Sequence, residues 1–316
     1  MQEDKIFDIE DTLYRNLEYI LENQGVGVEQ RAVELTEIAN AVAEQSVPLL
    51  KSGYALRDVI SILSDSLELG NYDKDCLFKE DAALVCHYNT LVKSFDKAYL
   101  SSLILSALRR RGYYMAEGDF LVPTDAKESF VYVRNTFSDE AFDVFSEGFE
   151  NPRVIYAESF KECVNALNDG RATFCLLPLE ERGSVRLAGV SELILKEDLK
   201  INAVSSVFGL DGNADMKYAL LSNGFINWEA QGEDDRYLEL RIMDKSSLEL
   251  SEILDAVKLF GHILFRIDTV CGTLNETEKF YSLVIRDGGR GFCDLLTYLT
   301  IFSDGFVPVG LYKNLE

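Results

Sequence analysis

The chain has 316 residues, of which 54 are Asp or Glu and 31 are Lys or Arg, so its formal net charge is −23. This excess of acid disfavours a nucleic-acid-binding surface, because phosphate contacts need clustered Lys and Arg. Apolar residues make up 47% of the chain, enough for buried cores. No apolar run approaches the roughly 20 residues that a membrane helix needs. Because the acidic N-terminus is also unlike a signal peptide, we predict a cytoplasmic protein without a membrane partner.

Cysteine and histidine are distributed in a way that excludes several kinds of chemistry. None of the six cysteines forms a C-x-x-C pair, so the sequence predicts neither a zinc clamp nor a redox pair. The two histidines, His87 and His262, lie far apart, which excludes a multi-histidine metal site within one chain. We therefore predict no metal site and no cofactor.

Residues 1–112 are predicted to form a helical bundle. Apolar residues recur at three- and four-residue spacing in five segments, namely 10–23, 29–50, 54–69, 79–94 and 96–111. Pro48 should bend or end the second of these helices. A hairpin or linker is expected over 113–128. Arg109–Arg111 just before it would suit a winged-helix DNA reader, but we prefer a solvated helix C-terminus because the bundle is acidic.

From residue 129 onward strands and helices alternate, which predicts a largely parallel sheet covered by helices. The expected strands are 129–134, 154–156 and 172–178, and the expected helices are 137–146 and 159–167. Ser159 should cap the second helix, with Glu162 in the capping-box position. Residues 199–207 and 215–222 are predicted to be adjacent antiparallel strands joined by a short turn.

The last 80 residues follow a polar, acidic linker at 225–235 and predict a ferredoxin-like βαββαβ pattern. The strands are expected at 236–243, 263–270, 278–286 and 305–312, and the helices at 247–260 and 291–302. The segment Asp287–Gly291 lies between a strand and a helix, as a phosphate loop does. It lacks the Lys-Ser/Thr of that motif, so we interpret it as a turn.

Several segments, in the expected order, resemble the prephenate dehydratase family. Asn135–Ala141 is similar to the family's G-T-F-S-E-x-A, and Glu158–Phe160 with Leu177–Glu180 is similar to S-F … V-P-I-E-N-S. Gly183–Val185 matches G-S-V, and Asp198–Ile201 matches D-L-x-I. Gly261–Asp268 and Phe306–Tyr312 resemble the regulatory ACT domain that ends most family members. The resemblance covers about residues 129–316.

This resemblance implies a fold, an activity and a set of site residues. After the helical bundle (1–112) and the hairpin or linker (113–128) expected above, it implies one α/β lobe of periplasmic-binding-protein-like type (129–224) and, beyond the linker at 225–235, an ACT-like domain (236–316). The family converts prephenate to phenylpyruvate, CO2 and water in phenylalanine biosynthesis. The matching positions make Thr136, Ser138, Glu180 and Lys217 the catalytic candidates. An ACT domain implies a homo-oligomer and an aromatic amino acid or prephenate-like ligand, with Leu248, Glu249, Asp268 and Thr269 at the ligand-binding positions.

The sequence also departs from the family pattern at positions that matter for catalysis. Met216 stands where the catalytic threonine is expected, and methionine has no proton to give to the leaving hydroxyl. Only a short turn separates 199–207 from 215–222, where the family has a second lobe. Leu248 replaces a glycine whose amide would approach the ligand in the ACT motif. In bifunctional family members a chorismate mutase domain precedes the dehydratase and needs several basic side chains to hold its dicarboxylate substrate. The first long helical segment here offers only Arg15 and Arg31, so we do not expect mutase activity.

These departures favour a catalytically impaired relative that acts as a ligand-sensing or interaction protein. A working dehydratase with an unusual site is the first alternative. A transcriptional regulator with an ACT sensor is the second.

Overall fold

The computed structural model describes most of the chain, namely residues 11–15, 18, 28–66, 82–121, 128–147, 149–181, 185–208, 214–226, 236–243, 246–271, 279–303 and 305–315. The chain divides into two compact units. One contains residues 1–120, 245–264 and 287–306, and the other contains 121–244, 265–286 and 307–316. No helix among the described residues has the length and apolar composition needed to cross a bilayer.

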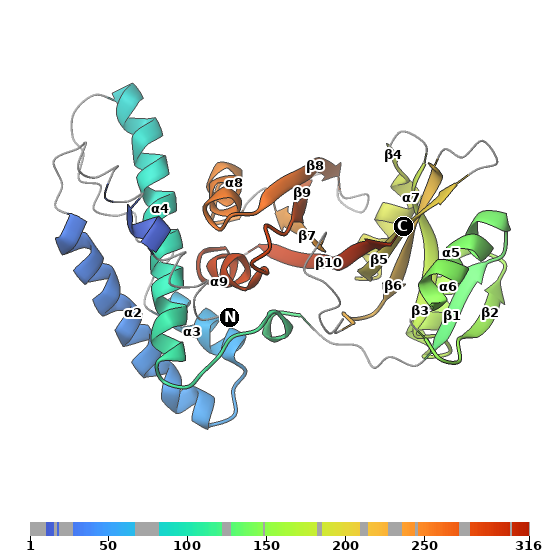
Figure 1. Ribbon diagram of the computed structural model, residues 1–316, viewed down its shortest axis with the longest axis horizontal. Helices are drawn as coiled ribbons and strands as arrows, with labels where there is room; N and C mark the ends of the chain where they lie inside the picture. Colours follow the sequence, from blue (N-terminus) through green and yellow to red (C-terminus); the bar gives the residue numbers. More distant parts are fainter. Residues whose placement is uncertain are drawn as a thin grey trace. The chain divides into compact units, whose positions relative to one another are not determined.

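The first unit is helical and is built around one long helix (Figure 1). It contains α2 (Val28–Lys51), α3 (Leu56–Ser66), α4 (Ala82–Arg109), α8 (Leu250–Leu259) and α9 (Cys293–Phe302). α4 packs against α2, α8 and α9, while α3 packs against α2 and α9. Every residue from 94 to 105 is buried, so α4 forms the core of this unit.

The helical unit corrects one sequence-based expectation and leaves another partly open. Two helices were expected at 79–94 and 96–111, but α4 runs through both without a break. No glycine or proline interrupts this stretch, and residues 94–105 are buried on every side of the helix, so no polar face marks a boundary there. Of the expected helix at 10–23, residues 11–15 are helical and most of the rest lies outside the described residues. Pro48 lies inside α2, which ends three residues later.

The hairpin expected after α4 was wrong for the part of 113–128 that the structure describes. Residues 113–121 contain only the short 3₁₀ helix η2 (Glu117–Asp119). This segment bonds to the start of α9 instead of to itself. The backbone N–H of Phe292 donates to Glu117 Oε1 at 2.7 Å, and Cys293 Sγ donates to the Met115 carbonyl at 3.4 Å. The winged-helix interpretation therefore has no support from residues 113–121.

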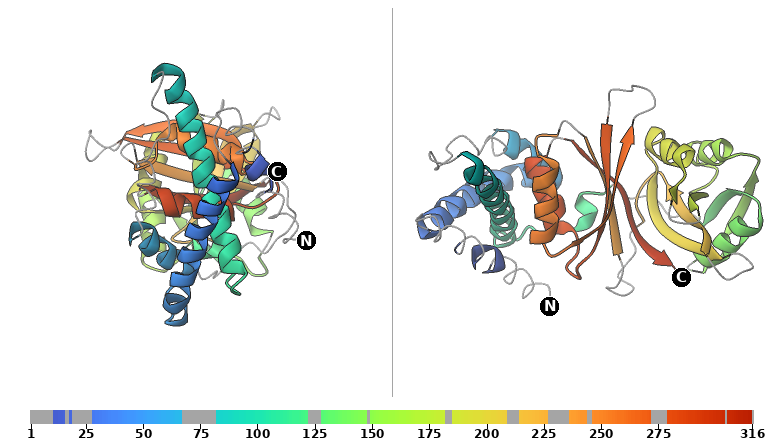
Figure 2. Two further views of the ribbon diagram at one scale, coloured as in Figure 1. Left: turned by 90° about the vertical axis from the view of Figure 1, so that its left-hand side faces the viewer. Right: turned by 90° about the horizontal axis from the view of Figure 1, so that it is seen from above.

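The second unit is organised by one sheet, whose strands are coloured from green (β1) to red (β10) in Figure 2. The strands in chain order are β1 (Ser129–Val133), β2 (Arg153–Ala157), β3 (Phe174–Glu181), β4 (Val185–Arg186), β5 (Lys200–Phe208), β6 (Ala214–Ser222), β7 (Arg236–Met243), β8 (Ile263–Cys271), β9 (Lys279–Arg286) and β10 (Phe306–Leu315). Their order in the sheet is β2-β1-β3-β6-β5-β10-β7-β9-β8, and β4 pairs with β3. The sheet is mixed and not largely parallel: β1 is parallel to β2 and β3, whereas β3, β6 and β5 pair antiparallel.

Strands β5 and β6 confirm the predicted antiparallel pair. Their register runs from Lys200 opposite Ser222 to Phe208 opposite Ala214. Strand β3 differs from the prediction, because it continues beyond Pro178 to Glu181. A register shift between Pro178 and Glu180 accommodates the proline, which has no N–H to donate to the neighbouring strand.

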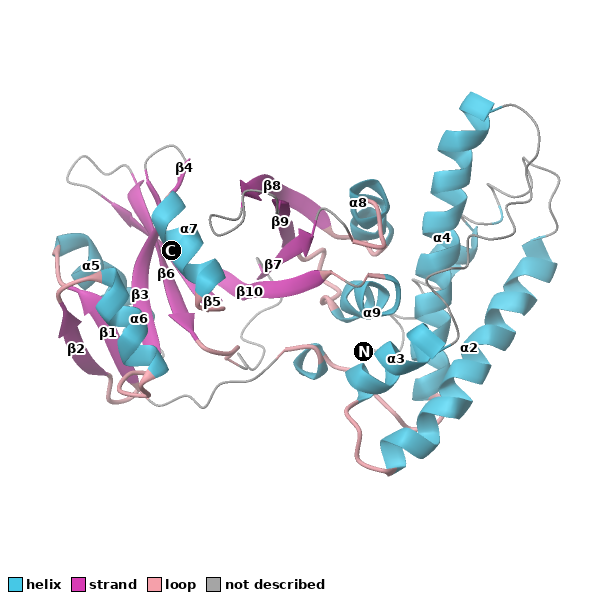
Figure 3. Ribbon diagram, turned by 180° about the vertical axis from the view of Figure 1, so that it is seen from behind, coloured by secondary structure: helices cyan, strands magenta, loops and turns pink. Residues whose placement is uncertain are grey.

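Helices cover both faces of the α/β part of this sheet (Figure 3). Residues of α5 (Thr136–Ser146) pack with the aromatic side chains of β1 and β3. Residues of α6 (Phe160–Asn168) and α7 (Ala188–Lys196) pack on the other face. The Ser159 side chain accepts from the Glu162 N–H as predicted, but the Glu162 carboxylate bonds the N–H of Glu158, one residue before the expected partner. The sequence analysis did not anticipate α7.

The C-terminal elements follow one another as β7-α8-β8-β9-α9-β10, which is a βαββαβ order. The segment Asp287–Gly291 is a turn, as interpreted from the sequence. The Asp287 Oδ1 accepts the N–H groups of Gly289, Arg290 and Gly291 at 3.0–3.1 Å. The turn's own carboxylate therefore holds the amides that a phosphate would need.

Candidate functional site

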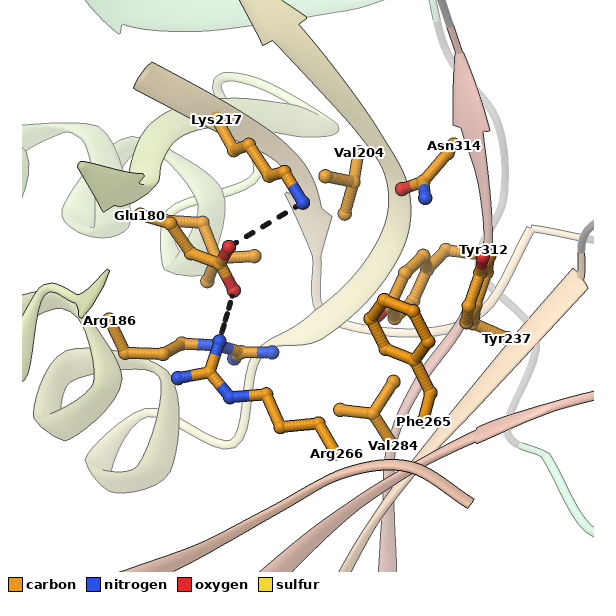
Figure 4. A pocket seen from close by; sticks show the side chains of 11 residues that line it. Glu180, Arg186, Val204, Lys217, Tyr237, Phe265, Arg266, Val284, Tyr312 and Asn314 are labelled. Carbon is orange, nitrogen blue, oxygen red and sulfur yellow. Dashed lines mark hydrogen bonds and ion pairs between the residues drawn. The ribbon is translucent and has the colours of Figure 1, made fainter. Parts of the chain in front are cut away.

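Glu180 is a buried carboxylate near the end of β3, just after the register shift at Pro178. Two of the strands that pair with β3 place cations directly beside Glu180, because Lys217 on β6 and Arg186 on β4 are both its register partners. The Lys217 Nζ lies 3.6 Å from Glu180 Oε2, and Arg186 Nε donates to Oε1 at 3.2 Å. A third cation, Arg266 from β8, donates through Nη1 to the same Oε1 at 2.8 Å. Figure 4 shows these cations around the carboxylate.

A second buried carboxylate, Glu239 on β7, extends this ion-pair cluster. Arg186 donates to it through both Nη atoms, at 3.1 and 2.8 Å, and the Ser282 hydroxyl donates at 3.2 Å. Burial alone would lower the pKa of Arg186, but the neighbouring carboxylates Glu239 and Glu180 outweigh it and leave that pKa raised. Arg186 therefore stays charged and ties β4 to β7.

The pocket around Glu180 is small and closed on one side by aromatic rings. Tyr237 stacks on Tyr312 with 5.7 Å between ring centroids, and Phe265 meets Tyr237 edge-on at 5.3 Å. The cavity measures about 20 Å³, space for about one water molecule. Asp268 binds Arg266 Nε at 2.5 Å, so Arg186, Arg266 and Lys217 face three carboxylates. Each of these three cations therefore already has a carboxylate partner.

Two of the four catalytic candidates meet in this pocket and two do not. Glu180 and Lys217 form the contact described above, whereas Thr136 and Ser138 do not line the pocket. Thr136 is exposed at the first turn of α5. The buried Ser138 hydroxyl accepts from the Asn135 N–H at 2.8 Å and lies 2.9 Å from the Val133 carbonyl. Ser138 is therefore used to cap α5.

Met216 and Tyr218 are packing residues, as one interpretation of the sequence proposed. Both contact the core that α5 covers, on the face of β6 opposite Lys217, and Tyr218 is buried. Burial raises the pKa of the Tyr218 hydroxyl, which makes it a poorer acid in the folded protein.

The four ligand-binding candidates fall in different parts of the structure. Leu248 is buried before α8, and Glu249 donates its N–H to Glu252 Oε2 at 3.0 Å. Both lie in the helical unit. Asp268 and the exposed Thr269 lie on β8 in the sheet unit, and Asp268 is engaged by Arg266.

The sequence analysis missed Arg186, Arg266 and Glu239 as members of the cluster. Arg186 directly follows the Gly183–Val185 motif, and Arg266 lies within the ACT-like motif. The signal for Glu239 was a charged residue among the apolar residues of the strand YLELRI, which also contains Arg241. Among the described residues, no group of three or more His, Cys, Asp or Glu side chains could hold a metal ion.

Comparisons with known proteins give structural similarities alone. No family model matches the sequence, and no curated protein matches it. The chain is similar to a prephenate dehydratase from Streptococcus mutans, with a TM-score of 0.46 and 14% identity over 60% of this chain and 99% of that one. It is similar to GqqA, described as a novel type of quorum-quenching acylase, with a TM-score of 0.46 and 15% identity over 60% and 96%. It is also similar to a prephenate dehydratase from Arthrobacter aurescens in complex with L-Phe, with a TM-score of 0.44 and 12% identity over 58% and 89%.

Proposed function

We propose that this chain is a prephenate-dehydratase-related protein of the phenylalanine branch that has lost efficient catalysis and acts as a ligand-sensing or interaction protein. The observation that carries the proposal is the ion-pair cluster around Glu180. Its three cations, Arg186, Arg266 and Lys217, already face three carboxylates, and the cavity between them has room for about one water molecule. Prephenate is a dianion, so its site needs uncompensated positive charge and an enclosed volume.

Two further features support this proposal. The side chain at the expected catalytic position, Met216, packs into the core and has no proton to donate. A positioned general acid contributes about 10²–10⁴-fold to rate, so its loss alone is a large penalty. The β5–β6 pair stands where the family would have a second lobe to enclose the substrate.

The test is a phenylpyruvate-formation assay near neutral pH on the purified protein. We expect no turnover above the acid-catalysed background. Thr136→Val should behave as the wild type, and Met216→Thr should not restore activity because the enclosing lobe is still missing. Wild-type turnover in the ordinary enzyme range, about 1–10³ s⁻¹, would contradict the proposal. Its loss in Thr136→Val would then identify Thr136 as the proton donor.

An active dehydratase with an unusual site is the second candidate. The observation that favours it is the Glu180–Lys217 contact, which brings together an acid and a cation from two of the family-like motifs. Under this proposal Glu180→Gln and Lys217→Met would each abolish turnover that the wild type possesses.

The C-terminal βαββαβ segment is proposed to serve as the sensor and oligomerisation element. Its support is the element order together with the ACT-like motifs at Gly261–Asp268 and Phe306–Tyr312. A thermal-shift screen with aromatic amino acids and prephenate tests this part. A ligand present at a hundred times its Kd should stabilise the protein by about 2.7 kcal/mol.

A further inference from the structure

The C-terminal end of α4 carries three consecutive arginines, and a pair of tyrosines follows them. Arg110 and Arg111 are exposed, Arg109 is partly exposed, and Tyr114 is 66% exposed. The Arg109 guanidinium lies over the Tyr114 ring, 5.9 Å from the ring centroid. Guanidinium groups and an aromatic ring therefore share one solvent-facing turn, residues 109–114, which we call the arginine–tyrosine patch.

The cations of this patch have no ion-pair partner within the part of the chain that the structure describes. No described carboxylate lies within 4 Å of a side-chain nitrogen of the three arginines, and Arg111 donates instead to the Ala107 carbonyl of its own helix at 2.9 Å. The next acidic residues along the chain, Glu117 and Asp119, each accept a backbone N–H at 2.7 Å. The positive charge of the patch is therefore available to an outside partner.

The patch differs in charge from the rest of this acidic chain. The net charge is −23, yet the segments 45–57 and 97–116 contain no Asp or Glu. The first of these segments joins α2 to α3 and adds the exposed side chains of Lys51 and Tyr54. In Figure 1, α2 and α4 both end at the bottom of the helical unit, and Figure 3 shows the same from behind. The basic region thus includes the ends of two helices.

The residue types in the patch indicate the kind of partner. Arg and Tyr are among the residues that most often dominate the binding energy of protein–protein interfaces, and the fork of a guanidinium matches a carboxylate. The contact between Arg109 and Tyr114 holds the ring in place before binding, which lowers the entropy lost on association. Nucleic acid fits less well, because its phosphate chain would continue from the patch onto a molecule with a net charge of −23.

We propose that the arginine–tyrosine patch is a docking surface for an acidic segment of a partner protein, in which carboxylates flank an apolar side chain. The carboxylates would pair with Arg110 and Arg111, and the apolar side chain would lie on Tyr114. This surface goes beyond the proposed function, because it belongs to the helical unit and would serve an active or an inactive dehydratase equally.

The experiment is a calorimetric titration of the full chain with the capped peptide Glu-Glu-Glu-Trp-Glu-Glu-Glu at low ionic strength. The comparisons are the same peptide with Gln in place of Glu, an oligothymidine and vesicles that contain phosphatidylserine. We expect one acidic peptide per chain and no binding of the Gln peptide. Raising the salt to about 1 M should weaken binding, since ion pairs at an exposed surface are screened.

Variants locate the binding surface. Arg110→Ser combined with Arg111→Ser should weaken binding of the acidic peptide at least about tenfold, since it removes charge-assisted hydrogen bonds. The matched control, Arg153→Ser combined with Arg171→Ser, removes the same charge from exposed positions in the sheet unit and should bind as the wild type does. Tyr114→Ala should reduce the preference for this peptide over one with Gly in place of Trp.

Several results would overturn the proposal: no binding of the acidic peptide by the wild type, equal binding of the Gln peptide, or equal binding by the wild type and the Arg110/Arg111 variant. Tighter binding of the oligothymidine or the vesicles would overturn the class of partner. The Arg110/Arg111 variant should melt as the wild type does, because both side chains are exposed. If it does not fold, the salt dependence and the Gln peptide decide on the wild type alone.

Discussion

At the scale of single residues, Glu180 holds the most connected position in the sheet unit, because one carboxylate contacts Arg186, Arg266 and Lys217. Glu180→Gln keeps the shape but removes the charge that these cations share. We expect a loss of about 3 kcal/mol in the free energy of unfolding, the range for breaking a buried ion pair on one side. Urea denaturation measures this. Asp169→Asn, in an exposed pair with Arg171, is the control and should cost under about 1 kcal/mol.

His262 gives a prediction about pH. Its side chain is buried against Phe292, and burial lowers its pKa to about 4. The pKa of a histidine in the unfolded chain is near 6.5, so on acidification the unfolded chain takes up the proton first. The free energy of unfolding therefore falls as the pH drops from 6.5 towards 4. Between pH 7.5 and 5 we expect a loss of about 2 kcal/mol from this group.

The measurement for His262 is the free energy of unfolding at several pH values, in the wild type and in His262→Gln. The variant should lose less stability over the same interval, because glutamine does not titrate. The two carboxylates near the ring, Asp287 and Glu117, are present in both proteins, so the comparison isolates the contribution of the imidazole. Parallel pH profiles would refute the assignment.

At the scale of secondary-structure elements, one buried ion pair joins α4 to α8. Lys97 Nζ lies 2.8 Å from Glu252 Oε1, and both side chains are almost fully buried. Lys97→Met leaves the Glu252 carboxylate unpaired and should cost about 3–5 kcal/mol. The double variant Lys97→Met with Glu252→Gln removes both charges and should recover much of that loss. If the double variant is as unstable as the sum of the singles, the pair does not act as a unit.

The turn between β9 and α9 gives a second prediction at this scale. A Cβ on Gly288 would lie 1.9 Å from the Gly261 carbonyl oxygen, and backbone atoms cannot move aside as a side chain can. Gly288→Ala should therefore lower the Tm clearly, by a cost of about 2 kcal/mol or more. Gly189→Ala, in α7 with open space around the position, should instead stabilise by about 0.5–1 kcal/mol. A thermal melt of each variant decides both expectations.

The elements that the sequence predicts well are those encoded by neighbouring residues. The β5–β6 pair follows from two apolar runs on either side of an Asp- and Gly-rich turn. The break expected inside α4 was wrong, because periodicity cannot distinguish two amphipathic helices from one continuous helix that is buried on every side at residues 94–105. The ion-pair cluster was missed apart from Glu180 and Lys217. Its contacts join residues 53 and 86 positions apart, and no local pattern encodes such contacts.

At the scale of the whole molecule, the N-terminal and C-terminal segments share one core. α4 packs on α8 and α9, so the two helices of the βαββαβ segment belong to the helical unit. Residues 1–120 are therefore unlike a domain that is simply appended to the chain. Truncation before residue 82 would remove α2 and α3 and expose the apolar surfaces of α4 and α9 that these helices contact.

The oligomeric state is the prediction that belongs to the whole molecule. β8 is the last strand in the sheet order, and its side chains Phe265 and Ile267 are 57% and 43% exposed. An edge strand presents unpaired N–H and C=O groups, and a two-fold-related copy can pair with it through the same residues. We expect a homodimer by light scattering at micromolar concentration, and Ile267→Lys should shift it to monomer because two lysines would meet across the axis. Ile62→Lys, at an equally exposed position on α3, should leave the dimer intact. A monomeric wild type would refute the dimer, and an Ile267→Lys dimer would show that copies meet through another surface.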